Sequence, residues 1–149
     1  MSEIRFLDEK DLDAVASLEM EVFSNPWNAQ VLKEELDTNP FYRAYLAEEN
    51  GCIEGYVSYL ITFDSATICR LAVKKEFRRQ GIAQRLLDQM VKDCQSKSEP
   101  VEWITLEVRE SNVAARTLYE KNGWENITIK KNYYENGENA IYMVRSILK

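Results

Sequence analysis

The chain has 149 residues, a net charge of −6 and no histidine. This length suits one core of ordinary size, so we expect a single domain over residues 1–149. The absence of histidine excludes a Ser-His triad and the usual zinc ligand sets, which leaves Glu, Asp, Tyr, Lys or Cys for catalysis without a metal. The negative charge disfavours nucleic acid and suits a cationic partner, although solubility alone also explains it.

The sequence carries no signal for a membrane or for export. No apolar run approaches the roughly 20 residues that cross a bilayer, and residues 1–5 lack the pattern of a signal peptide. We therefore expect a cytoplasmic protein without a membrane partner. Cys52, Cys69 and Cys94 are widely spaced in apolar surroundings, which predicts reduced thiols in the core.

The first half of the chain predicts short strands and two helices. In chain order we expect a strand around residues 4–6, helices over 12–23 and about 31–36, and strands over 42–47 and 52–62. The dipeptide Asn50-Gly51 separates the last two strands. Because both residues tolerate a positive φ, this pair predicts a tight hairpin.

The second half predicts strands alternating with helices. The expected elements are a strand over residues 67–73, a helix over 81–97, a strand over 102–108, a helix over 112–123, and strands over 124–133 and 140–147. Gly123 is a natural left-handed cap for the second of these helices. This order, with antiparallel hairpins at both ends and β-α-β-α-β between them, indicates a mixed α/β sheet.

Residues 78–83, Arg-Arg-Gln-Gly-Ile-Ala, lie where a strand turns into a helix. A glycine at such a turn leaves the first helical N–H groups open, and the positive end of the helix dipole then faces a phosphate. The two arginines add charge of the right sign. A P-loop and a dinucleotide-binding loop both need glycine patterns that this chain lacks, so the loop predicts another phosphate ligand.

Several motifs follow this loop in a characteristic order. They are Leu-Glu-Val-Arg at residues 106–109, Ser-Asn-Val-Ala-Ala at 111–115, Leu-Tyr-Glu-Lys-Asn-Gly-Trp at 118–124 and Asn-Tyr-Tyr at 132–134, with Phe-Ser-Asn-Pro-Trp at 23–27 before the loop. Together they resemble the acetyl-CoA-dependent N-acetyltransferases of the GNAT superfamily, and within it the branch that acetylates ribosomal-protein alanine. The likeness spans about residues 11–143.

The resemblance implies a seven-stranded, mostly antiparallel mixed sheet with about four helices and a central β-α-β-α-β core that binds acetyl-CoA. No metal is implied. The residues expected to bind the coenzyme are Leu71, Ala72, Val73, Arg79, Gln80, Gly81, Ile82, Ala83, Gln84 and Asn112. In the family, the strand binds the pantetheine arm through its main chain, and a strand N–H polarises the thioester carbonyl. Ala83 stands where many relatives have glycine, and Asn112 also suits a helix cap.

Two residues are expected to carry the chemistry. Glu107 alternates with Leu106 and Val108, so it points away from their face of the strand, and the resemblance makes it the general base. The competing interpretation is a surface glutamate paired with Arg109. The family's general acid corresponds to Tyr119, for which simple packing is the alternative. Cys69 as an acyl carrier is disfavoured, since nothing near it would lower the pKa of its thiol.

Three aromatic residues are expected at the acceptor site. Trp27, Tyr133 and Tyr134 lie on connections that converge over the acceptor site in the family, although loop aromatics also serve as packing. The resemblance implies a basic protein N-terminus, that of the eighteenth protein of the small ribosomal subunit. The alternatives are a small-amine or lysine acetyltransferase and, in another class, a non-catalytic acyl-CoA-binding module, which would need neither Glu107 nor Tyr119.

Overall fold

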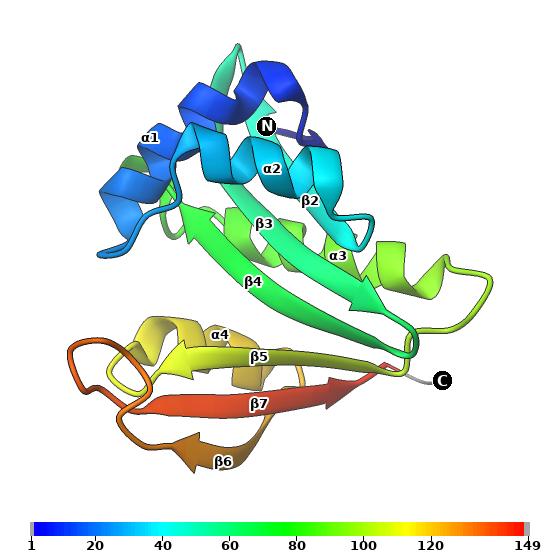
Figure 1. Ribbon diagram of the computed structural model, residues 1–149, viewed down its shortest axis with the longest axis vertical. Coiled ribbons are helices and arrows are strands. Elements are labelled where there is room, and N and C mark those ends of the chain that lie inside the picture. Colours follow the sequence, from blue (N-terminus) through cyan, green and yellow to red (C-terminus); the bar gives the residue numbers. More distant parts are fainter. Residues whose placement is uncertain (1, 148–149) are drawn as a thin grey trace.

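The computed structural model describes residues 2–147, which form a seven-stranded sheet in the order β1-β2-β3-β4-β5-β7-β6 (Figure 1). The strands are β1 Glu3–Phe6, β2 Tyr42–Glu49, β3 Cys52–Thr62, β4 Ser65–Val73, β5 Trp103–Arg109, β6 Glu125–Lys130 and β7 Ala140–Ser146. The helices are α1 Leu12–Val22, α2 Ala29–Thr38, α3 Ile82–Gln95 and α4 Val113–Lys121, with short 3-10 turns η1 Glu9–Asp11 and η2 Lys75–Phe77. The predicted mixed, mostly antiparallel sheet is confirmed.

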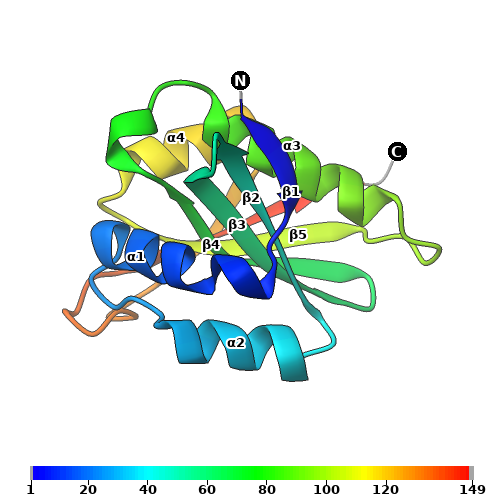
Figure 2. The same cartoon turned by 90° about the horizontal axis from the view of Figure 1, so that it is seen from above.

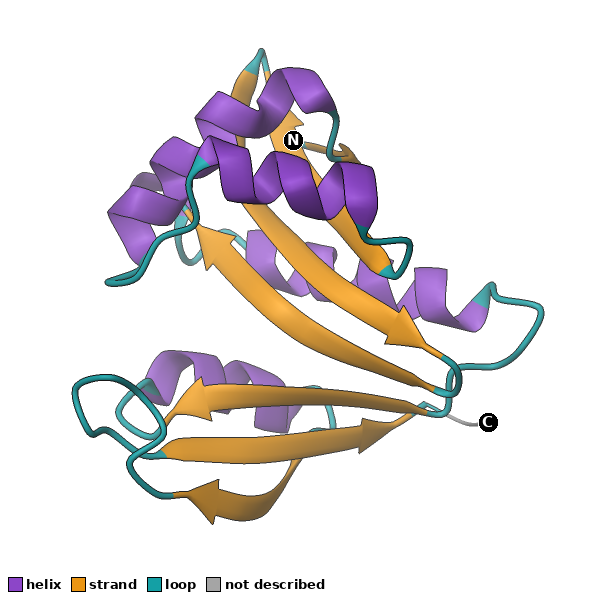
Figure 3. Ribbon diagram, in the orientation of Figure 1, coloured by secondary structure: helices purple, strands orange, loops and turns teal. Residues whose placement is uncertain are grey.

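Helices cover the two faces of the sheet unequally. Figure 2 shows α1 and α2 on one side and α3 and α4 on the other. A first core lies beneath α3 and α4, where Ile82, Leu86 and Met90 are almost completely buried. A second core lies beneath α1 and α2 and includes Val15 and Leu32. In Figure 3 the helices α1 and α2 stand in front of β2 and β3, whereas no described helix stands in front of β5, β7 and β6.

The β2–β3 hairpin turns at Asn50 and Gly51, as predicted. Their φ angles are 53° and 79°, so both residues adopt the left-handed conformation that such a turn requires. On the other side of β3, Gly55 brings that strand against β4. A Cβ atom at Gly55 would lie 2.7 Å from the carbonyl oxygen of Ala72, so only glycine fits without a shift of the backbone.

The parallel pair β4–β5 is short. Only Ser65, Ala66 and Thr67 pair with β5, opposite Trp103, Ile104 and Thr105. Beyond this point the two strands diverge, and their carboxyl ends point to the same side of the molecule but lie apart (Figure 1). The far end of β4 therefore pairs with β3 alone, which leaves backbone groups on its β5 side free for another partner.

Two expectations about the chain are wrong. The strand expected to reach Tyr133 ends at Lys130, because Asn132 takes a left-handed φ of 52° that a strand does not tolerate. Tyr133 and Tyr134 consequently belong to the loop between β6 and β7. Cys52, expected in the core, is exposed at the start of β3, whereas Cys94 is buried. None of the three cysteines forms a disulfide in the described chain.

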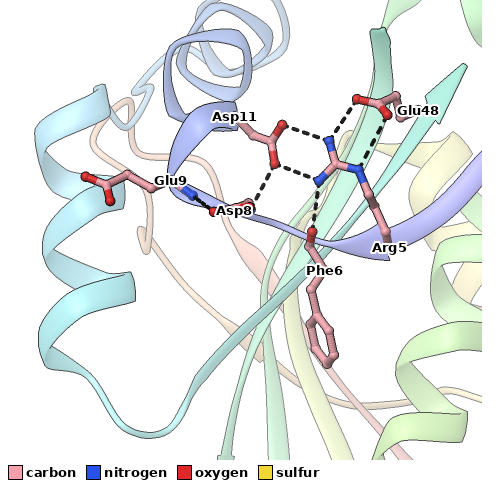
Figure 4. A network of polar contacts seen from close by, with 6 residues as sticks. All are labelled: Arg5, Phe6, Asp8, Glu9, Asp11 and Glu48. Atoms are coloured by element: carbon pink, nitrogen blue, oxygen red, sulfur yellow. Dashed lines mark hydrogen bonds and ion pairs between the residues drawn. The ribbon is translucent and has the colours of Figure 1, made fainter. Parts of the chain in front are cut away.

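Arg5 ties β1 to the start of α1 and to β2 (Figure 4). Its guanidinium donates to both carboxylate oxygens of Asp11, at 2.8 and 2.9 Å, and to Glu48 at 2.8 Å. Hydrogen bonding from Arg5 holds the pKa of Asp11 below its usual range, against the opposing effect of burial. This network fastens a strand of only four residues.

Candidate active site

The loop before α3 exposes the amino end of that helix. Gly81 is the helix cap, with φ of 80°, and it supplies no side-chain oxygen to the first turn. The first helical hydrogen bond runs from Arg85 N–H to the Gly81 carbonyl at 3.1 Å. The N–H groups of Ile82, Ala83 and Gln84 therefore precede the helical ladder and can donate to an anion.

Positive charge surrounds this helix end. Lys74, Lys75, Arg78 and Arg79 all lie within one short stretch, and Arg79 takes a left-handed φ of 65°. The fold thus combines cationic side chains, open N–H groups and the helix dipole at one position. Such an arrangement favours a polyphosphate, so the phosphate loop stays a prediction that this geometry allows.

The free edge of β4 leads away from this loop. Leu71, Ala72 and Val73 follow the point at which β4 leaves β5, and they pair with Val57, Tyr56 and Gly55 of β3. The carbonyl of Val73 accepts a hydrogen bond from Arg78 Nε at 3.2 Å. An extended ligand arm could therefore hydrogen-bond along the β5 side of this strand segment, beginning near the anion site.

Two other residues that were expected to bind the coenzyme form hydrogen bonds within the protein through their side chains. Asn112 caps α4, since its side-chain oxygen accepts from Ala115 N–H at 3.2 Å. The Gln84 amide exchanges two hydrogen bonds with Asn122 at the end of α4, at 2.6 and 2.9 Å. Gln84 therefore joins α3 to α4 through its side chain, and its N–H alone remains available to a phosphate.

Glu107 lies on the face of β5 that no helix within residues 2–147 covers. Its neighbours Leu106 and Val108 are buried on the opposite face, as the alternation predicted. The interpretation of Glu107 as a partner of Arg109 is wrong. Lys130 of β6 donates to Glu107 Oε2 at 2.9 Å, and Arg109 instead pairs with Glu138 at 3.2 Å. The sequence alone did not indicate Lys130 as the partner of Glu107, because only the order of strands brings the two side chains together.

Tyr119 approaches β5 from the other side of the sheet. Its side chain is buried in the first core and packs edge-to-face on Trp124, with ring centroids 5.7 Å apart. Burial, with a smaller contribution from Tyr134, raises the pKa of the Tyr119 hydroxyl well above its ordinary value. The phenol is therefore protonated at neutral pH.

The two loops expected at the acceptor site meet at Arg109. This side chain reaches Ser24 Oγ, in the connection between α1 and α2, at 3.5 Å. Its guanidinium also lies 4.0 Å from the ring of Tyr134 in the β6–β7 loop. Tyr133 packs edge-to-face on Tyr134, at 5.1 Å between centroids. The structure thus brings Tyr133 and Tyr134 together beside β5.

Trp27 is held on the other loop by a buried carboxylate. The backbone N–H of Trp27 donates to Glu19 Oε1 at 2.8 Å. The fully buried Glu19 side chain also accepts a hydrogen bond from the Tyr56 hydroxyl. Arg70 forms an ion pair with Glu19 at 3.2 Å and lies over the rings of Phe23 and Trp27, at 4.4 and 5.2 Å. This network orders the α1–α2 connection.

Cys69 does not have the surroundings of a nucleophile. Partial burial and the charge of Glu35 raise the pKa of its thiol to about 11, which opposes formation of a thiolate at neutral pH. Among residues 2–147, no group of three acidic or cysteine side chains is placed to hold a metal ion. In the same part of the chain, no helix is long and apolar enough to span a membrane.

Open N–H groups at the start of α3, a strand that leaves its neighbour, and a carboxylate on the next strand agree with an acyltransferase. The chain belongs to the acetyltransferase (GNAT) domain family, whose model matches residues 8–147. The resemblance inferred from the motifs is therefore confirmed.

Similar proteins cover almost the whole chain. The [ribosomal protein bS18]-alanine N-acetyltransferase of Escherichia coli (strain K12) is 30% identical over 150 residues, which are 99% of each chain. A protein of Bacillus subtilis (strain 168) is provisionally named for the same activity. It is 36% identical over 141 residues, which cover 94% of this chain and 92% of the Bacillus protein. The crystal structure of the ribosomal-protein-S18-alanine N-acetyltransferase from Escherichia coli superposes with a TM-score of 0.89, covering 100% of this chain and 96% of that one.

Proposed function

We propose that this chain transfers the acetyl group of acetyl-CoA to the N-terminal α-amine of a basic protein, namely the alanine of ribosomal protein bS18. One observation carries the proposal: open helix N–H groups among basic side chains follow β4, and a carboxylate lies on β5, the strand from which β4 diverges. The acceptor is supported by the relatives named for that activity over nearly their full length. Such an enzyme would work in the cytoplasm, as one domain over residues 1–149.

The coenzyme-binding residues form one continuous path in this proposal. Arg79, Gln80, Gly81, Ile82, Ala83 and Gln84 would hold the pyrophosphate through N–H groups and charge. Leu71, Ala72 and Val73 would bind the pantetheine arm along the free edge of β4, and Asn112 would contact it from the start of α4. The path is supported by the short β4–β5 pairing and by the uncapped helix end.

The chemistry follows from the state of the attacking amine. An α-amine has a pKa of about 7.7–8.0, so at neutral pH most of it is protonated and cannot attack a thioester. Glu107 would accept this proton, directly or through water, and the amine nitrogen would then bond to the thioester carbon. As the carbon–sulfur bond breaks, Tyr119 would protonate the leaving thiolate. Trp27, Tyr133 and Tyr134 would surround the peptide end.

A peptide competition tests this function. A peptide beginning Ala-Arg with a free N-terminus should be acetylated with kcat/KM at least about tenfold above the same peptide with a blocked N-terminus and only lysine amines free. Mass spectrometry of ribosomal-protein N-termini in a deletion strain would identify the natural acceptor. Preference for spermidine or for an internal lysine would replace the α-amine with the small-amine or lysine alternative.

A further inference from the structure

The candidate base already holds an ammonium group in this structure. Lys130 Nζ lies 2.9 Å from Glu107 Oε2, and it also lies 5.5 Å from the ring centre of Tyr133 and 5.0 Å from that of Tyr142. One carboxylate and the faces of two aromatic rings are a favourable environment for a primary ammonium ion. The same features would attract the protonated amine of a substrate.

Few other charged groups compete for this position. Tyr133 and Tyr142 lie near Lys130 and Glu107, and Arg109 and Glu138 lie near the neighbouring Tyr134. Of the two carboxylates, Glu138 is engaged by Arg109 and by Ser111 N–H at 2.8 Å. Glu107 is therefore the carboxylate at which an incoming ammonium would bind. In this structure the Lys130 ammonium occupies that position.

The Lys130 contact is weak enough to be exchanged. The two side chains remain 42% and 25% exposed, and ion pairs of that exposure contribute little to stability. Lys130 is the last residue of β6, an edge strand whose residues are all exposed. Its side chain can leave Glu107 without disturbing a core. Two ammonium groups cannot both occupy this one carboxylate without like-charge repulsion.

We propose that Lys130 is a resident ammonium of the acceptor site, held by Glu107 and two tyrosine rings until the acceptor's own amine takes its place. The inference rests on the proposed function, since it assigns the acceptor amine to Glu107. Lys130 then sets how readily a cationic acceptor enters, and it has no part in bond formation. It is a specificity-determining residue, distinct from the general base that it covers.

Steady-state kinetics test the exchange. Lys130→Met keeps the length and apolar stem but removes the competing charge, so KM for the Ala-Arg peptide should fall about threefold to tenfold. kcat should stay within about twofold, as should KM for acetyl-CoA, whereas a supporting role for Lys130 would lower kcat instead. Lys130→Arg should restore the wild-type KM. Lys131→Met, which removes the adjacent exposed charge, is the matched control and should change neither constant.

A zero-length cross-link tests the same exchange without turnover. A water-soluble carbodiimide should join the Glu107 carboxylate to the Lys130 amine as an amide, with loss of one water, and peptide mass spectrometry would detect the link. The free Ala-Arg peptide well above its KM should lower this yield at least about fivefold and couple to Glu107 itself. The N-acetylated peptide should leave the yield unchanged.

The outcomes separate this inference from the proposed function. A Glu107–Lys130 cross-link that persists with excess free acceptor overturns the resident ammonium, and so does an unchanged KM in Lys130→Met. If the cross-link is displaced but no α-amine is acetylated, the resident ammonium stands and the proposed function fails. If only lysine ε-amines are acetylated, the proposed α-amine acceptor is wrong. The KM of Lys130→Met and the displacement of the cross-link, both measured with a lysine acceptor, then decide the role of Lys130.

Discussion

The two halves of the sheet differ in what covers them. Strands β2, β3 and β4 lie between α1 and α2 on one face and α3 on the other, and most residues of β2 and β3 are buried. Strand β5 alternates buried and partly exposed residues, and β6 is exposed throughout. A strand packed on both faces uses nearly every side chain for the core. A strand packed on one face keeps every second side chain for chemistry, which is where Glu107 lies.

The largest expected effect concerns the open half. Glu107→Gln keeps the shape of the side chain and removes the proton acceptor, so kcat should fall about 10²-fold or more while acetyl-CoA affinity is unchanged. Higher pH should partly restore the rate, because free amine then accumulates without a base. Glu125→Gln, an exposed carboxylate on β6, is the matched control. Wild-type turnover of Glu107→Gln at pH 7 would reduce Glu107 to a surface residue.

The next effect concerns the boundary between the halves, where α3 begins. Gly81→Val forces a branched residue into a left-handed φ and should weaken acetyl-CoA binding at least tenfold, or about 1.4 kcal/mol, as measured by calorimetry. Gly51→Val is a close control, since Gly51 has a φ of +79° against +80° and neither position has an atom within 4 Å of an added Cβ. Equal affinities in both variants would remove the phosphate-loop assignment.

A smaller effect should distinguish the two acceptor loops. Trp27→Ala and Tyr134→Ala should each raise the peptide KM roughly fivefold, because loss of an aromatic anchor typically costs about 1 kcal/mol. Only Trp27→Ala should also lower the melting temperature, since Trp27 packs against the second core on the covered half. Similar melting temperatures for the two variants would contradict this contrast.

The smallest effect on activity should come from the Arg5 network on the covered half. Because the folded pKa of Asp11 is depressed, its contribution to stability is present above the unfolded pKa of about 3.9 and is lost as the pH falls through the folded value. Asp11→Asn should therefore lower the free energy of unfolding by about 1 kcal/mol at pH 6 without changing turnover. The difference in the free energy of unfolding between the two proteins should shrink as the pH falls below about 3.9, and a difference that stays constant over that range would contradict this linkage.

Local features of this sequence could be predicted because short-range physics determines them. The Asn50-Gly51 turn follows from backbone freedom, and the opposite facing of Glu107 and Leu106 follows from the two-residue period of a strand. The opening of α3 after Gly81 follows from a glycine beside basic residues. The family motifs extended these local predictions to the residues proposed to bind the coenzyme.

The tertiary structure determines which side chains from distant segments of the chain come into contact. Insertion of β7 between β5 and β6 places Lys130 beside Glu107, 23 residues away in the chain, and leaves Arg109 to Glu138. The sequence offered Arg109, two positions from Glu107, as the nearer partner. The sequence by itself determined which side chains face away from the core. Only strand order determined which of them meet, because pairing between strands depends on packing over the whole sheet.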